Sequence, residues 1–394
     1  MQNFKSFISA ALLITGTSVG AGMLGIPLVT SIAGFYPSLL ITFLCWLVMM
    51  ATGLLFLEVT LWMPKGANLL SMAKRFLGPV GASLSGFTFL FLYYCLMIAY
   101  MAGGSPLFQS VISNVFGLQI PLWASYVLFC GLFGGIVYGG SLVLGRLNTI
   151  LTVALVASYF LLISKGSAFV IVENLQRASW PLFYMAAPVL FSAFGYHNIV
   201  PTISDYLKRN AKALRWCIFV GTLIPFIIYS LWQWLIIGAV PAELIEAAEK
   251  GNIPVTDILS RSLHNDWIGQ VAQFFSFFAL VTSLLGVAYS MCDFLADGFK
   301  CSKNRLNWLL ITLLVFIPPA YVAFSNPTIF VSALGYAGGF GEAILNGLLP
   351  ISMYWIGRYR FNLGNKIWIG NRAILVLLTF MILAVIGIEV AMMV

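Results

Sequence analysis

The stretch GTSVGAGMLGIP, from Gly16 to Pro27, interrupts the first long apolar run of this 394-residue sequence. It places four glycines within ten residues, and each glycine costs about 0.8–1 kcal/mol of helix stability relative to alanine. Pro27 has no N–H, so the carbonyl of Met23 loses its helical partner. Thr17 and Ser18 add hydroxyls that compete for backbone groups. We therefore predict a helix that is broken within this stretch.

Backbone groups that are freed at membrane depth are tolerated only where protein or a watery cavity satisfies them. The break therefore indicates a binding site, and the alternative is close helix packing through the Gly16-x-x-x-Gly20 pattern. The stretch also matches the G-x-S-x-G and G-x-G-x-x-G patterns of soluble enzymes. Both patterns need a preceding strand in a soluble sheet, so neither predicts an enzyme here.

The membrane assignment rests on composition and on run length. The chain is 61% hydrophobic and 8% charged, whereas soluble domains carry about 25% charged residues. Spanning segments must satisfy their own backbone hydrogen bonds, which favours helices. We expect an all-α polytopic membrane protein that forms a single transmembrane domain over residues 1–394. The apolar runs lie at 6–31, 36–62, 80–108, 121–141, 145–164, 181–204, 213–238, 267–299, 307–325, 327–357 and 373–393.

The net charge of +8 comes from lysines and arginines in the loops between apolar runs, so it does not predict a nucleic-acid partner. Eleven spans place the termini on opposite sides, and cytoplasmic loops collect lysine and arginine. We therefore expect a cytoplasmic N-terminus and an outside C-terminus at Val394. One side carries Lys5, Lys65, Lys74, Arg75, Arg146, Lys208, Arg209, Lys212, Arg215, Lys300, Lys303, Arg305, Arg358, Arg360, Lys366 and Arg372, and the other carries Lys165, Arg177, Lys250 and Arg261.

The sixth apolar run repeats the pattern of the first. It reads PVLFSAFGYHNIVPTI from Pro188, with Gly195, His197 and Asn198 inside the run and Pro201 after them. The sixth run comes five spans after the first, an odd offset, so the two interrupted helices cross the membrane in opposite senses. Such a pair is typical of an inverted repeat that holds substrate at the midplane. The first repeat covers about 6–164, the second about 181–357, and an eleventh helix covers about 373–393.

These segments resemble the hydroxy and aromatic amino-acid permease family, as do AYMAGG (99–104), TSLLGVAYSMCDFLAD (282–297) and ALGYAGG (333–339). The match covers nearly the whole chain and is nearest to bacterial tyrosine-specific permeases of the amino acid–polyamine–organocation superfamily. The resemblance implies a leucine-transporter-like fold of five plus five helices with discontinuous helices 1 and 6. It also implies proton-driven import of free tyrosine or tryptophan across a bacterial-type inner membrane. Asn198 departs from the family, which usually has glycine after the histidine.

A zwitterionic substrate can be bound by the backbone at such breaks, because helix N-termini attract a carboxylate and helix C-termini attract a cation. The resemblance implies that Ala21 and Gly22 supply N–H groups to the carboxylate. It also implies that Ser18 and the carbonyls of 191–194 meet the ammonium. The substrate-binding residues that we predict are Thr17, Ser18, Gly20, Ala21, Gly22, Phe191, Phe194, Gly195, Tyr196 and His197.

His197 is the only histidine within a span, and ionisable groups inside membranes are functional candidates by default. Its side chain is expected to contact the substrate or act as a gate. The alternatives are a structural histidine and a proton carrier.

The coupling ion is expected to be a proton, with sodium as the alternative, and no other cofactor or metal is predicted. Ala279, Thr282 and Ser283 resemble a leucine-transporter sodium site, which carbonyls of Gly16 and Val19 would complete. Hydroxyls and carbonyls suit a hard cation, although hydroxyls in helices also bond back to their own backbone. Glu342 in the tenth run is a further proton-carrier candidate.

Charges near span ends predict an inner gate in which Lys5 pairs with Asp297 or Asp293 when the site faces outward. Glu58 is expected to snorkel to the interface, and the same behaviour is the alternative for Asp293 and Asp297. Glu389, near the outer end of the last run, is expected at the interface.

Together these features predict a secondary active symporter that imports an aromatic amino acid by alternating access. The alternatives are a sodium-coupled transporter and a neutral amino-acid transporter of broader specificity. A channel would need a lined pore and usually subunit symmetry, whereas this chain shows an internal repeat. The expected partners are the free amino acid and the lipid bilayer, and the sequence predicts no oligomeric state.

Overall fold

The computed structural model describes residues 2–251, 255–263, 266–301, 304–364 and 367–393, and these residues contain helices and no strand. In chain order the helices are α1 (Gln2–Ser18), α2 (Gly22–Thr30), α3 (Phe35–Trp62), α4 (Leu69–Phe116), α5 (Leu122–Tyr138), α6 (Ser141–Gly166), η1 (Ser167–Phe169), α7 (Val172–Gln176), η2 (Trp180–Ala186), α8 (Ala187–Ala193), η3 (His197–Ile199), α9 (Val200–Tyr206), α10 (Ala211–Ala239), α11 (Ala242–Gly251), α12 (Val255–Leu263), α13 (Asp266–Gly298), α14 (Arg305–Ser325), α15 (Ile329–Tyr336), η4 (Ala337–Leu348), α16 (Leu349–Trp355), η5 (Ile356–Arg360), η6 (Trp368–Gly370) and α17 (Arg372–Met393).

Within the described residues, seven continuous helices are long and apolar enough to cross a membrane, namely α3, α4, α6, α10, α13, α14 and α17. The bent pair α1 and α2 makes an eighth candidate. The other three predicted spans are the shorter apolar helix α5, the interrupted sixth run and the tenth run. The all-α, multi-pass prediction is therefore confirmed.

Both predicted helix breaks are present. The α1 helix ends at Ser18 and α2 begins at Gly22, with a bend of 56° between them. The α8 helix ends at Ala193, and Phe194 and Tyr196 then leave helical geometry before η3 begins. Glycine and proline weaken helical hydrogen bonding locally, which is why both breaks lie where the sequence predicts them.

Small residues allow the pieces of the broken helices to approach one another. A Cβ on Gly22 of α2 would lie 3.1 Å from the Cα of Ala193 at the end of α8. A Cβ on Gly338 of η4 would overlap the carbonyl of Pro188. The α2 helix is buried along its whole length, so the two breaks sit in the centre of the molecule.

The tenth run is helical throughout but changes its hydrogen-bond pattern. Between α15 and α16, the 12 residues of η4 form a π-helix, and η5 is also a π-helix. Such segments are rare and occur frequently at functional sites. The η4 segment carries Glu342 toward the broken sixth run.

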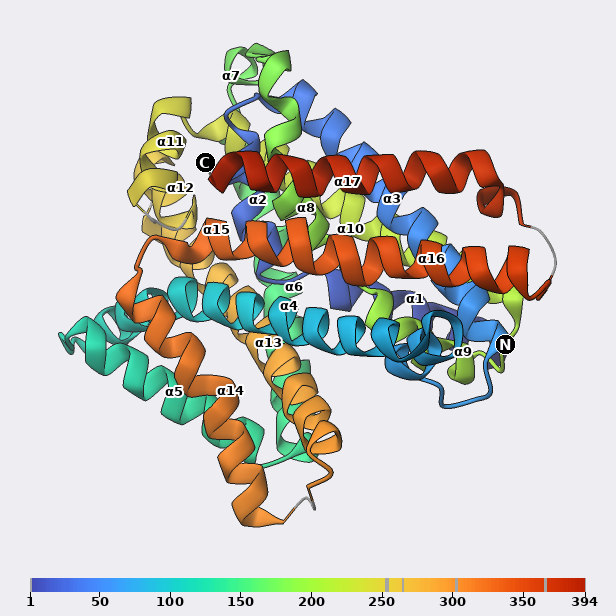
Figure 1. Cartoon of the computed structure of the whole chain (residues 1–394). Helices are drawn as coiled ribbons and strands as arrows, with labels where there is room; N and C mark the ends of the chain where they lie inside the picture. The colour runs from blue at the N-terminus through green and yellow to red at the C-terminus, as the bar shows by residue number, and fades with distance from the viewer. Residues whose placement is uncertain (1, 252–254, 264–265, 302–303, 365–366, 394) are drawn as a thin grey trace.

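Figure 1 shows α15, η4 and α16 running beside α17, with α5 and α14 in an outer layer near α13. The N-terminus lies close to α9, and the C-terminus lies at the opposite end of the long helices (Figure 1). This placement agrees with an odd number of membrane crossings.

Candidate functional site

A cavity of about 390 Å³ connects the two helix breaks. This volume lies in the range of about 300–1,000 Å³ that is typical of small-molecule sites. The predicted residues that line it are Thr17, Ser18, Gly20, Ala21, Gly22, Gly195, His197, Ser283 and Glu342. The structure thus brings together residues from α1, α2, the break after α8, α13 and η4.

The cavity reaches the end of the molecule that holds the N-terminus. Its lining includes residues 66–70, which cover the end of the loop before α4 and the start of α4, together with Thr202 and Asp205 of α9. Thr17 and Asn198 line the cavity and are exposed to solvent. On the opposite side the fully buried α2 is covered by α11, α12 and α15. The site is therefore open at one end of the bundle and closed at the other.

One N–H group that was predicted to meet a carboxylate is held by a side chain of α13. The Ala21 N–H donates to Ser283 Oγ at 2.9 Å. The same hydroxyl fills the space that a Cβ on Gly20 would need. Glycine at this position thus allows α13 to approach the first break. This approach places Ser283, from the predicted cation site, next to the predicted substrate-binding residues Gly20 and Ala21.

Tyr229 of α10 connects the ends of both broken helices, and sequence reasoning missed it. Its hydroxyl lies 2.6 Å from the Ser18 carbonyl and 2.8 Å from the Ala193 carbonyl. The side chain is fully buried, and its ring packs edge-to-face on Phe194 at 5.1 Å. A tyrosine O–H has one hydrogen to donate, so two acceptors converge on one donor. No local pattern distinguishes this tyrosine from the 15 others in the chain.

Other residues of the predicted cation site lie outside the cavity lining. Thr282 Oγ1 donates to its own helix, at 2.8 Å from Phe278 O and 3.2 Å from Ala279 O. Gly16 is exposed, and Val19 donates its N–H to Thr15 O at 2.8 Å. The Thr282 hydroxyl thus adopts the back-bonded arrangement that was the alternative to cation binding.

His197 lines the cavity with one ring nitrogen satisfied. Its Nε2 lies 3.0 Å from Thr52 Oγ1, and its ring packs against Tyr196 at 4.6 Å. Within the described residues, Nδ1 is buried and has no hydrogen-bond partner. The neighbouring Asn198 donates to the Tyr93 hydroxyl at 3.2 Å.

Glu342 reaches the second break from η4. Its carboxylate accepts a hydrogen bond from Asn346 and lies where a Cβ on Gly195 would be. Glu342 is only 5% exposed, and both Glu342 and Asn346 line the cavity. A buried carboxyl is therefore in direct contact with the break in the sixth run.

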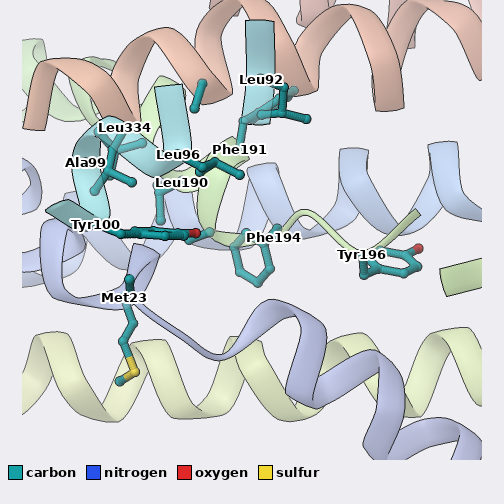
Figure 2. Packing of buried hydrophobic residues seen from close by; sticks show 14 of the residues in the cluster. Met23, Leu92, Leu96, Ala99, Tyr100, Leu190, Phe191, Phe194, Tyr196 and Leu334 are labelled. Carbon is teal, nitrogen blue, oxygen red and sulfur yellow. The ribbon is translucent and has the colours of Figure 1, made fainter. Parts of the chain in front are cut away.

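Aromatic side chains form two groups at the site. Phe191, Phe194 and Tyr196 are buried behind the lining, and Figure 2 shows Phe191 and Phe194 near Tyr100 of α4, with Tyr196 farther away beyond Phe194. Tyr196 donates to Met49 O at 3.3 Å. These three predicted residues therefore support the break without lining the cavity.

The second aromatic group lines the cavity and was not predicted. Phe89 of α4 stacks on Tyr93 at 4.0 Å and on Phe294 of α13 at 4.2 Å. Stacked rings of this kind present flat apolar faces that suit another aromatic ring.

Among the described residues, no ion pair joins the predicted gate residues Lys5 and Asp297 in this conformation. Lys5 and Asp297 are both exposed, and Asp293 lies one turn before Asp297 on α13. The two ion pairs within the described residues join other groups. Arg209 lies 4.0 Å from Asp205, and Arg215 lies 2.6 Å from Glu58.

Two acids expected at the interface are buried within the protein. Glu58 is 6% exposed and paired with Arg215 of α10. Glu389 is 3% exposed, and the interfacial position of both acids stays a prediction. Both are buried by helices that sequence reasoning could not place beside them.

Comparison with known proteins identifies the family. Residues 3–388 match the tryptophan/tyrosine permease family. The tryptophan-specific transport protein of Haemophilus influenzae is 29% identical, covering 98% of this chain and 96% of the relative. The tyrosine-specific transport system 1 of the same organism is 30% identical, covering 95% and 94%. The tryptophan-specific transport protein of Pseudomonas aeruginosa is 27% identical, covering 95% and 92%. The chain therefore belongs to the tryptophan/tyrosine permease family, whose members are transporters and not enzymes.

Proposed function

We propose that this protein is a secondary active symporter that imports tyrosine, tryptophan or both, coupled to protons, by alternating access. The family supports the aromatic substrate, as do relatives named for tryptophan or tyrosine transport. The observation that carries the proposal is that both helix breaks and Glu342 face one cavity. Breaks at membrane depth supply backbone groups for a zwitterion, and a buried carboxyl offers a proton-binding group.

The proposed architecture is a leucine-transporter-like repeat of five plus five helices, followed by α17. Support comes from the two breaks, which lie five spans apart and face the same cavity. The uneven distribution of lysine and arginine supports a cytoplasmic N-terminus. In that orientation the cavity opens to the cytoplasm, and the conformation is inward-facing.

The substrate ammonium is proposed to bind the Ser18 and Ala193 carbonyls, which now surround the Tyr229 hydroxyl. An ammonium group has three hydrogens, so it can satisfy both acceptors at once. The carboxylate is placed at the N–H groups of Ala21 and Gly22, where Ser283 now accepts from Ala21. In this scheme the hydroxyls of Tyr229 and Ser283 are hydrogen-bonded to these backbone groups until the substrate takes the place of the hydroxyls.

The substrate ring is placed toward the stack of Tyr93, Phe89 and Phe294. His197 Nδ1 is a polar group without a partner among the described residues, and it would meet a phenol hydroxyl or an indole N–H. This role leaves the Thr52 contact of the same ring intact.

Uptake into proteoliposomes of the purified full chain tests the proposal. Labelled tyrosine, tryptophan and phenylalanine are offered under a pH gradient alone, a sodium gradient alone, and neither. We expect tyrosine or tryptophan to accumulate under the pH gradient and to show counterflow. Accumulation under sodium alone would establish the sodium-coupled alternative, and conductance without counterflow would indicate a channel. Failure to accumulate any aromatic amino acid would contradict the substrate assignment.

A further inference from the structure

Glu389 is a carboxyl that the proposed transport path does not use. It is the only acidic residue of α17, and it is 3% exposed. Its Oε2 atom is buried and has no hydrogen-bond partner within the described residues. A carboxyl buried in this way is unfavourable unless it serves a function or is neutralised.

The Glu389 side chain packs against two successive turns of the tenth run. A Cβ on Gly335 would lie 2.9 Å from Oε1 and 3.0 Å from Oε2. A Cβ on Gly339 would lie 2.6 Å from the Cβ of Glu389 and 3.1 Å from its Oε2. Only glycine leaves room for the carboxyl at both positions. The α17 helix thus presses an acid directly onto the backbone of α15 and η4.

No described cation compensates a charge on this carboxyl. The elements packed against α17 include η4, α8, α16 and η6. Of these, α8 carries no titratable residue, and the Tyr354 hydroxyl of α16 lies against Gly370 at the far end of α17. Tyr336 of α15 packs on Phe340, and Glu342 contacts Asn346. Cys95 of α4 is a further titratable neighbour among the described residues, and it cannot supply positive charge.

A buried carboxylate without a cation or several donors is strongly unfavourable, whereas the protonated carboxyl is tolerated. We propose that Glu389 is a membrane-buried proton-binding site, which holds a proton while α17 packs on Gly335 and Gly339 and exchanges it when these surfaces separate. The proton binds a carboxylate oxygen and leaves to water, so the step is reversible protonation alone.

This site is distinct from Glu342, which faces the opposite direction from η4. Glu342 contacts Gly195 and lines the cavity, whereas Glu389 contacts η4 from the side of α17. The π-helical segment therefore lies between two carboxyls on different surfaces. Exchange at Glu389 rests on the proposed function, since it requires η4 to move against α17 during the transport cycle.

Infrared spectroscopy of the full-length protein in lipid tests proton binding without transport. We expect a protonated-carboxyl C=O band near neutral pH that disappears in Glu389→Gln, an isosteric variant that keeps the packing. Glu342→Gln is the matched control and should leave that band in place. A spectrum unchanged by Glu389→Gln would overturn the proposal. Thermal unfolding of each variant checks that it is folded, and Glu389→Asp provides a second titratable variant if glutamine destabilises the protein.

Transport measurements then test exchange during the cycle. We expect Glu389→Gln to retain substrate counterflow and to lose part of the pH dependence of net uptake, which Glu389→Asp should restore. An identical pH profile in wild type and Glu389→Gln would overturn exchange at this site. Absence of aromatic amino-acid uptake in the wild type would instead contradict the proposed function and leave the infrared result standing.

Discussion

At the scale of single residues, one hydroxyl joins the two broken helices. Tyr229 of α10 reaches the Ser18 carbonyl at the end of α1 and the Ala193 carbonyl at the end of α8. Both carbonyls are last-turn acceptors that lack a helical donor. A side chain from a third helix therefore satisfies groups that the breaks expose, and the same groups suit an ammonium.

Tyr229→Phe removes this hydroxyl and keeps the ring on Phe194. Loss of the donor leaves a buried carbonyl unsatisfied, which costs about 1–3 kcal/mol. We expect the substrate-free protein to unfold at a lower temperature and the substrate to raise that temperature more than in wild type. Thermal unfolding with and without tyrosine or tryptophan measures both effects.

The matched control is Tyr159→Phe. The Tyr159 hydroxyl donates to Ile228 O at 2.9 Å, away from the cavity lining. This variant should lower the unfolding temperature without enlarging the effect of substrate. If substrate raised the unfolding temperature of Tyr229→Phe less than that of wild type, the hydroxyl would be shown to help substrate binding and not to compete with it.

At the scale of elements, glycine sets the distance between η4 and the broken sixth run. The backbone of Gly338 lies directly against the Pro188 carbonyl and close to the Ser192 N–H. Pro188 and Ser192 are the first and last residues of one turn of α8. Because the opposing atoms belong to the backbone, no change of rotamer can make room for a side chain. The π-helical segment and α8 therefore form one tightly packed unit behind the cavity.

Gly338→Ala should force η4 away from α8. Overpacking of a core typically costs about 1–3 kcal/mol, so we expect a lower unfolding temperature and reduced uptake. Gly286→Ala on α13 is the control, because nothing lies within 4 Å of a Cβ at that position. The interpretation would be contradicted if both variants unfolded and transported alike.

At the scale of the whole molecule, the cavity is open at the end that holds the N-terminus and closed at the other. In this conformation Lys5 and Asp297 are exposed and form no ion pair with each other. The predicted gate requires them to meet only when that end closes. An open cavity with separated gate residues is compatible with that scheme, and the pairing itself stays a prediction.

Charge exchange between Lys5 and Asp297 tests the gate. We expect Lys5→Asp and Asp297→Lys each to reduce uptake, because each places like charges together when the end closes, and we expect the double variant to recover uptake. Exposed pairs contribute about 0–1 kcal/mol, so each single loss should be several-fold at most. Lys74→Asp, on a charge outside the cavity lining, is the control. A double variant as impaired as the worse single variant would contradict the pairing.

Much of the fold could be predicted because its causes are local. Long apolar runs with few charges specify membrane helices, and glycine with proline weakens hydrogen bonds within a few residues of itself. Both breaks and the family resemblance follow from such segments. The sequence by itself therefore determined that the protein is a multi-pass helical transporter with two broken helices.

Only the tertiary structure decided which groups meet at those breaks. Ser283 binds Ala21 across 262 positions of the chain, and Tyr229 reaches Ser18 across 211 positions. Glu389 is buried because α17 happens to pack on the glycines of α15 and η4. Such contacts depend on the packing of whole helices, and in an apolar sequence one helix face looks much like another. Sequence patterns locate the exposed backbone groups, whereas helix packing selects the side chains that satisfy them.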